Sequence, residues 1–193
     1  MKSKELQQHF SSKEKKFFEE IKVYLKKSDK VLKIGNGFGY LSEFIRDYVS
    51  EIKILEIHIF EKTINKTNVT LYDGLNVPAR EKEYDVAVFN LVLHHIPNNI
   101  EYLKQVTAKT RRSIVLYEQT YDNLFQKIQL VWRDWYINRQ AGTPCRIYWN
   151  SYFKRSELEG QLKQAGLRVV HRYTKRSHTY YKELLILGMD ENG

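Results

Sequence analysis

The stretch that decides the fold is "VLKIGNGFGY", residues 31–40. A short apolar run meets three glycines at alternate positions, Gly35, Gly37 and Gly39, and an amphipathic segment follows them. A strand, a glycine-rich turn and the start of a helix together present backbone N–H groups and a positive helix end to a ligand. The third glycine of the dinucleotide fingerprint and the G-K-[ST] ending of a phosphate loop are absent. The stretch therefore predicts either a cofactor loop or a tight structural turn.

Strands and helices alternate on both sides of this stretch. Apolar residues recur at helical spacing from residue 17 to residue 25 and again directly after Gly39. Five apolar runs predict strands: "VLKI" (31–34), "ILEIHIF" (54–60), "VTLY" (69–72), "DVAVF" (85–89) and "SIVLY" (113–117). This alternation is typical of an open, mainly parallel α/β sheet.

The last third of the chain has a different pattern. The spacing of apolar residues at 124–135 predicts an amphipathic helix with large aromatic side chains, and a loop, "NRQAGTPCRIYWN", is expected at 138–150. Ser156 and Glu159 have the spacing of a capping box, which predicts that a helix starts there. Two closing strands are expected at 167–173 and 183–188. No linker divides the sequence, so residues 1–193 are expected to form a single domain.

The composition excludes some classes of function. No run of 18 apolar residues is present, so no membrane span is expected, and the N-terminus has no apolar core typical of a signal peptide. The single cysteine, Cys145, excludes an internal disulfide and suits a reducing compartment, which predicts a cytoplasmic protein. We interpret Cys145 as a loop thiol. The net charge of +9 favours anionic partners, whether small molecules, RNA or an acidic membrane surface.

Two further motifs carry polar residues at predicted strand ends. In "YDGLNVP" (72–78), the Asp73 carboxylate can accept a hydrogen bond from an adenine amino group, although Asp-Gly is also a common turn. In "YDVAVFNLVLHHIPN" (84–98), Asn90 ends the central strand, where open α/β sheets hold their ligands. His94 and His95 follow. Adjacent histidines on a helix point apart, and no third ligand has a useful spacing, so no metal site is expected.

Together, the glycine loop, "YDGLNVP" and "YDVAVFNLVLHHI" resemble the class I S-adenosylmethionine (SAM)-dependent methyltransferases, in particular the small "LHH" type. The resemblance covers about residues 31–188. It implies SAM as the cofactor and a Rossmann-like open sheet of about seven strands, mostly parallel with an antiparallel last strand and with helices on both faces. It also implies a helical cap over the substrate at about 120–155.

The resemblance assigns cofactor contacts to individual residues. It implies that Gly35 and Gly37 lie against the methionine part of SAM and that Asn36 between them also binds the cofactor. It places Asp73 and Gly74 at the adenine, and Asn90 and Leu91 beside the sulfonium.

Two acids of the family pattern are missing at their usual places. Lys33 replaces the acid that faces the methionine amino group, and like charges there would repel each other. The acid that holds the ribose hydroxyls falls near His58. Glu56 and Glu61 flank His58, and a shift of two or three residues would bring either of them to that place, so the register stays open.

The leading hypothesis is in-line methyl transfer from SAM to a small, anionic or aromatic molecule. An oxygen or nitrogen nucleophile needs a base, and His95, His94 and Glu118 are the candidates. The candidate substrate pocket consists of Tyr117, Trp132, Arg146 and Trp149.

Two alternatives remain open. Lys33 and His58 favour a methyltransferase-like binding protein that has lost catalysis. The net charge alone favours an RNA methyltransferase, but nucleic acid is not the favoured partner because no RNA-binding appendage is visible. The oligomeric state is left open.

Overall fold

The computed structural model describes residues 3–143 and 145–190. Its α-helices are α1 (Ser3–Ile21), α2 (Tyr40–Arg46), α3 (Asn99–Lys109), α4 (Leu124–Ala141) and α5 (Leu158–Gln164). Its strands are β1 (Lys30–Ile34), β2 (Glu51–Glu56), β3 (Val69–Leu71), β4 (Tyr84–Asn90), β5 (Thr110–Tyr121), β6 (Phe153–Lys154), β7 (Leu167–Ser177) and β8 (Tyr180–Met189). The 3-10 helices are η1 (Lys22–Tyr24), η2 (Lys66–Asn68), η3 (Leu93–His95) and η4 (Trp149–Ser151).

The strands form one open sheet in the order β3-β2-β1-β4-β5-β8-β7, and the short β6 pairs with β5. The strands from β3 to β5 are parallel to one another, whereas β8 is antiparallel to both β5 and β7. The predicted open sheet with an antiparallel last strand is therefore confirmed. Because β1, β2 and β4 run in the same direction, their carboxyl ends meet at one edge, where such sheets hold ligands.

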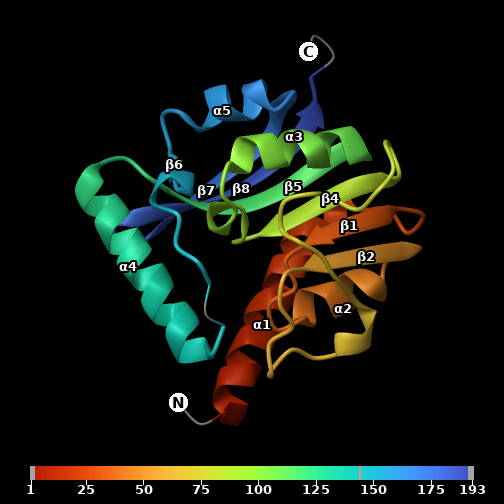
Figure 1. Ribbon diagram of the computed structural model, residues 1–193, viewed down its shortest axis with the longest axis horizontal. Helices are drawn as coiled ribbons and strands as arrows, with labels where there is room; N and C mark the ends of the chain where they lie inside the picture. The colour runs from red at the N-terminus through yellow and green to blue at the C-terminus, as the bar shows by residue number, and fades with distance from the viewer. Residues whose placement is uncertain (1–2, 144, 191–193) are drawn as a thin grey trace.

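Helices cover both faces of this sheet (Figure 1). On one face, apolar residues of α1 and α2, such as Phe17 and Ile45, pack against Val31, Val88 and Ile186 of the strands. On the other face, α3 and α5 bury a second cluster against the same strands. No helix in the described part of the chain has the length and apolar character that crossing a membrane requires.

The helix α4 lies at one end of the sheet, beyond β5 and β8, which it contacts (Figure 1). Asn123 caps the N-terminus of α4: its side chain accepts a hydrogen bond from Gln126 N. The helix ends at Gly142, whose φ of 72° is the left-handed conformation that favours glycine.

The structure differs from the sequence predictions at several boundaries. The opening helix begins at Ser3, well before the apolar stripe, and β2 ends at Glu56, so residues 57–60 leave the sheet. The predicted capping box is wrong: α5 starts after Glu157 without a side-chain cap. Glu159 instead accepts a hydrogen bond from Arg172 at 2.9 Å, and this cross-element pair takes the carboxylate away from the helix start.

Candidate functional site

The glycine loop follows β1 with Gly35, Gly37 and Gly39 at φ of 71°, 55° and 92°. A Cβ atom at Gly35 would lie 2.7 Å from Cγ2 of Val92, so this glycine permits close packing against the segment after β4. A Cβ atom at Gly37 would meet nothing within 4 Å. One side of the loop is therefore closed against the protein, and the other borders open space.

Glu56 holds this loop from the end of β2. The carboxylate Oε2 accepts hydrogen bonds from Asn36 N at 2.6 Å and Gly37 N at 3.3 Å. Glu56 is buried, whereas His58 and Glu61 are exposed. Of the three residues that sequence left open for the ribose position, the structure brings only Glu56 to the glycine loop.

Lys33 is also part of the loop's support. It is 3% exposed, and its Nζ donates to Ile34 O at 3.1 Å and to Gly35 O at 2.6 Å. Burial lowers the pKa of Lys33 to about 8, although the carboxylates of Glu14 and Glu56 oppose this change. The ammonium group thus faces backbone carbonyls and does not extend to solvent.

Sequence reasoning missed Glu14 of α1. Its Oε2 accepts a hydrogen bond from Leu41 N, in the first turn of α2, at 2.7 Å. Burial raises the pKa of Glu14, and the bond to Leu41 N and the charge of Lys33 oppose this rise. Glu14 precedes Phe17, Phe18 and Ile21 by three, four and seven residues, so it shares their buried face. The sequence signal that could have identified Glu14 is an acidic residue in line with the apolar residues of the helix.

The residues predicted to contact adenine form a turn after β3. Asp73 is exposed; its Oδ1 accepts from Leu75 N and Asn76 N, both at 2.8 Å, and its Oδ2 accepts from the Asn76 side chain at 2.7 Å. These bonds lower the pKa of Asp73. Gly74 lies in this turn with a φ of 76°. The Asp73 carboxylate therefore stabilises a turn, as the alternative interpretation of Asp-Gly expected. Its contact with adenine stays a prediction.

Asn90 and Leu91 lie at the carboxyl end of β4. Asn90 is half-buried at the last position of the strand. Leu91 has a φ of 54° and donates its N–H to Tyr117 O at 2.8 Å. The main chain therefore turns sharply out of the sheet next to the glycine loop.

The structure brings His94, His95 and Glu118 together with Asp134 of α4, which sequence reasoning missed. His94 Nδ1 lies 2.6 Å from Glu118 Oε2, and both side chains are buried. His94 Nε2 and His95 Nε2 each lie 3.5 Å from the same atom, Asp134 Oδ2. The expectation that the two rings point apart is wrong: their centroids are 4.2 Å apart, because Leu93–His95 forms a 3-10 helix followed by an extended residue.

The surrounding groups fix this cluster. His95 Nδ1 lies 3.1 Å from Arg146 O, and the Tyr152 hydroxyl donates to Asp134 Oδ2 at 2.7 Å. Burial opposes charge on His94, but the Glu118 and Asp134 carboxylates outweigh it and raise the pKa of His94 to about 10. Burial and the neighbouring His94 charge lower the pKa of His95 to about 4.

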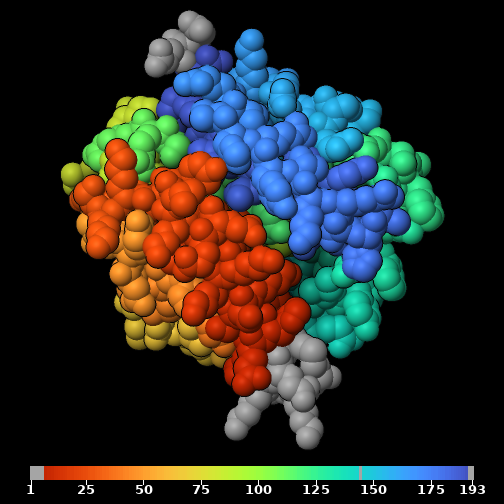
Figure 2. Space-filling view, turned by 180° about the vertical axis from the view of Figure 1, so that it is seen from behind, coloured from red at the N-terminus to blue at the C-terminus, as the bar shows by residue number. Residues whose placement is uncertain are grey.

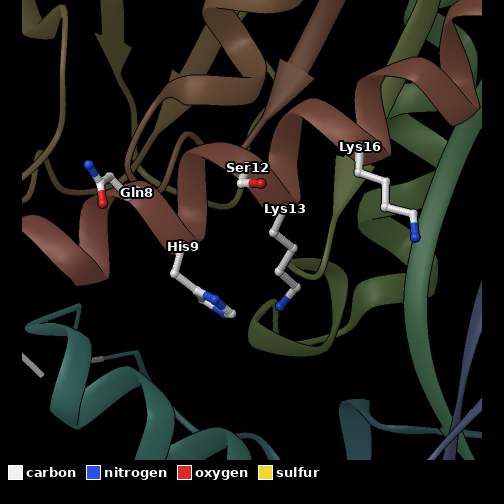
Figure 3. A pocket seen from close by; sticks show the side chains of 5 residues that line it. All are labelled: Gln8, His9, Ser12, Lys13 and Lys16. Atoms are coloured by element: carbon white, nitrogen blue, oxygen red, sulfur yellow. The ribbon is translucent and has the colours of Figure 1, made fainter.

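A hollow of about 540 Å³ lies beside the polar half of α1 (Figures 2 and 3). His9 and Lys13 extend from the helix into this hollow, with the teal of α4 on its far side (Figure 3). The residues that line it are Gln8, His9, Ser12, Lys13 and Lys16. The early start of α1, which the apolar pattern did not predict, supplies this wall.

Lys13, which lines the hollow, lies near two further cations, Arg133 and Lys182. Lys13 of α1, Arg133 of α4 and Lys182 of β8 have no ion pair among the described residues. Burial, followed by the charges of Lys13 and Arg133, lowers the pKa of Lys182 to about 8. Within residues 3–143 and 145–190, Arg133 Nε and Gln119 Oε1 are buried without a hydrogen-bond partner. Gln119 lies directly opposite Lys182 in the sheet, so both side chains are on one face.

The predicted aromatic pocket is not assembled in one place. Tyr117 packs against Phe17 of α1, with ring centroids 4.7 Å apart. Trp132 is 63% exposed and stacks on Tyr136, and Trp149 is exposed beneath the ammonium group of Lys127. Arg146 is exposed and contributes its backbone oxygen to His95.

Comparisons with known proteins fit this geometry. The family model described as "Methyltransferase domain" matches residues 5–172. No curated protein sequence matches the chain. The fold is similar to that of a SAM-dependent methyltransferase from Methanosarcina mazei (TM-score 0.65, 16% identity, 88% of this chain and 96% of that chain covered).

Two other solved structures have the same fold. They are the YcgJ protein of Bacillus subtilis (TM-score 0.65, 12% identity, 96% and 100% covered) and the 1,6-didemethyltoxoflavin-N1-methyltransferase of Burkholderia thailandensis (TM-score 0.59, 14% identity, 85% and 72% covered). The latter structure contains bound 1,6-didemethyltoxoflavin and S-adenosylhomocysteine. At these identities the likeness concerns the fold alone.

Proposed function

Because the chain belongs to the class I SAM-dependent methyltransferase family, we propose that it transfers a methyl group from SAM to a small anionic molecule. The observation that carries the substrate class is the convergence of unpaired Lys13, Arg133 and Lys182 between α1 and α4. Half-buried cations without a carboxylate partner, such as Arg133 and Lys182, are costly unless a ligand of opposite charge completes the site.

The glycine loop fits the methionine end of SAM. Gly37 borders open space, and the loop lies at the carboxyl end of β1. Lys33 directs its ammonium group at backbone carbonyls instead of the open side, and Glu14 and Glu56 lie close enough to offset its charge. The repulsion that the sequence suggested is thereby reduced. In this proposal the methionine part is held by Gly35, Asn36 and Gly37.

The adenosine part would lie along the neighbouring strand ends. Glu56 is better placed than the exposed His58 for the ribose hydroxyls, because its buried carboxylate already lies at the glycine loop. Asp73 and Gly74 would meet the adenine, and Asn90 and Leu91 would border the sulfonium. SAM supplies a methyl group on a positively charged sulfur, which an in-line nucleophile displaces.

The protein's part in this reaction is alignment and exclusion of water. We propose that residues 120–155 act as a cap, because Asp134 of α4 reaches the histidines that follow β4 and Arg133 faces Lys13. Glu118 and His94 are buried and bonded to each other, so they position the substrate side of the site and do not contact the substrate. His95, which is less buried, is the closest of the three to a ligand position.

Calorimetry tests both halves of the proposal. SAM should bind the wild-type chain, and inorganic pyrophosphate, as an anionic probe, should bind in the hollow. Lys13→Gln and Lys182→Gln should each weaken pyrophosphate binding about tenfold or more, since a hydrogen bond to a charged group is worth about 1.5–3 kcal/mol. Lys163→Gln, which removes an exposed lysine of α5, is the matched control and should change nothing. Equal pyrophosphate affinity in all four proteins would exclude the hollow as an anion site.

The alternative function is a binding protein that has lost catalysis. It is favoured by one observation: Glu56 and Lys33 already engage amides and carbonyls of the glycine loop within the protein. If the folded wild-type chain fails to bind SAM while it still binds pyrophosphate, this alternative replaces the enzyme.

A further inference from the structure

We propose that His94, His95 and Asp134 form a binding site for a divalent transition-metal ion, for which zinc is the best fit. Two imidazole nitrogens and one carboxylate oxygen are the ligand types that zinc accepts in sites with an open position. The site is separate from the glycine loop, and the proposal does not depend on methyl transfer.

The ligand atoms already lie close together. One ring nitrogen of His94, one of His95 and a carboxylate oxygen of Asp134 are all within 4.8 Å of one another. Each of the two nitrogens is 3.5 Å from Asp134 Oδ2. Ligand atoms at about 2.0–2.1 Å from a tetrahedral zinc ion lie about 3.3–3.4 Å apart. The two nitrogen–oxygen separations therefore need only small side-chain movements to accept the ion.

The other nitrogen of each ring is held by a partner. His94 Nδ1 is 2.6 Å from Glu118 Oε2, and His95 Nδ1 is 3.1 Å from Arg146 O. A carboxylate or a backbone carbonyl at this second nitrogen is the usual support of a metal-binding histidine, because it fixes the tautomer and the ring orientation. Both Nε2 atoms are thereby directed at the same carboxylate oxygen.

The Asp134 carboxylate is also held by hydrogen bonds. The Tyr152 hydroxyl donates to Asp134 Oδ2 at 2.7 Å, and the Asn138 side chain donates to Asp134 Oδ1 at 3.0 Å. The Tyr152 ring also stacks on His94, with centroids 4.9 Å apart. Every proposed ligand thus has a fixed orientation before the ion binds.

His94 Nε2 is a buried polar atom that the ion would coordinate. The His94 side chain is 1% exposed, and within the described chain its Nε2 makes no hydrogen bond. Coordination would give this buried nitrogen a direct bond, which its 3.5 Å contact with Asp134 Oδ2 does not provide.

The charges also match. Glu118 and Asp134 contribute two carboxylates to the cluster, and the ion would bind both imidazoles in their neutral form, displacing the proton that the carboxylates hold on His94. A divalent cation would neutralise both carboxylates. With three protein ligands, a coordination position remains for water or for an oxygen atom of a substrate. Because the ligands come from η3 and α4, the ion would also tie α4 to the carboxyl end of β4.

Titration of the chelator-treated protein with zinc chloride, against a chromophoric competitor and without SAM, tests the site. One ion should bind per chain. Cobalt(II) should give the intense visible bands of a four-coordinate site with nitrogen ligands, while magnesium chloride should not compete. Glu118→Gln should weaken zinc binding about 10–100-fold, as loss of a supporting carboxylate does, and His95→Gln and Asp134→Asn should weaken it further.

His171→Gln is the matched control, because it removes an exposed histidine of β7. Far-ultraviolet circular dichroism verifies that each variant is folded. Zinc binding that is absent in the wild type, or equal in His95→Gln and wild type, overturns the proposal; His94 would then act as a charged partner of Glu118 and Asp134. Since SAM is absent from these measurements, a negative result leaves the SAM-binding proposal intact.

Discussion

Lys33 lies beside the glycine loop with its charged group directed into the protein. Its ammonium group meets two carbonyl oxygens, and Glu14 from α1 and Glu56 from β2 are the charged groups that face it. Desolvation nevertheless dominates, so the pKa of Lys33 falls to about 8 from 10.5. A buried ammonium group of this kind is a source of pH-dependent stability.

The pH dependence of unfolding should reveal the lowered pKa of Lys33. Between pH 8 and 10.5 the native state releases the Lys33 proton while the unfolded chain keeps its own, so the free energy of unfolding should rise with pH. Relative to Lys33→Met, the wild type should gain about 2–4 kcal/mol across this window. Urea unfolding of both proteins at several pH values measures the difference, in which the titration of Lys13 and Lys182 cancels. A constant difference would mean that Lys33 is not desolvated.

Gly35 is the glycine at which a side chain is least tolerable. Its φ of 71° is strained for an L residue, and the new Cβ would lie 2.7 Å from Val92. Gly35→Ala should therefore lower the free energy of unfolding by about 2–4 kcal/mol. Gly160→Ala, in helix α5, is the control, because its added Cβ meets nothing within 4 Å. Its free energy of unfolding should rise by about 0.5–1 kcal/mol. Urea unfolding distinguishes the two; equal effects would contradict the packing argument.

Among the elements, β5 and β8 carry two buried carboxylates directly opposite each other, Glu118 and Glu183. Like charges in this position repel, so each needs its own partner. Glu118 is 2.6 Å from His94, and Arg172 of β7 holds Glu183 with two hydrogen bonds of 3.0 Å. The pairing of three strands thus depends on two separate ion pairs.

Removal of Arg172, the partner of Glu183, should strongly destabilise the protein. Arg172→Leu leaves Glu183 buried and unpaired, which should lower the free energy of unfolding by about 3–5 kcal/mol. Arg168→Leu, on an exposed position of the same strand, should stay within about 0.5 kcal/mol of the wild type. The double variant Arg172→Leu/Glu183→Leu should recover most of the loss. If it does not, the loss comes from strand packing and not from the unpaired charge.

The elements that sequence predicted well are those whose signal is local. The run 31–34, the glycines and the helix after Gly39 follow one another directly, and β4 is a continuous apolar run, so periodicity sufficed. The boundaries of α1 and β2 were missed because contacts with a distant segment place them: Phe10 of α1 packs on Phe38, and Ile64 N donates a hydrogen bond to Phe38 O.

The candidate site was predictable only in part, for the same reason. Asp134 lies some 40 residues from His94 and on a helix whose register against η3 no local pattern gives. Lys13, Arg133 and Lys182 come from α1, α4 and β8, and only the folded chain brings them together. The adjacent histidines were misjudged because an α-helix was assumed where a 3-10 helix forms.

At the scale of the whole molecule, the strand order constrains how the protein is made. β8 follows β7 in the chain but lies between β5 and β7 in the sheet. The β7–β8 hairpin is local and can form early, yet it can dock only after residues 180–189 have left the ribosome. Until then one edge of β5, the strand that carries the buried residues Ile114, Val115 and Leu116, has no partner. A nascent or truncated chain is therefore exposed to edge-to-edge aggregation along β5 until the hairpin docks.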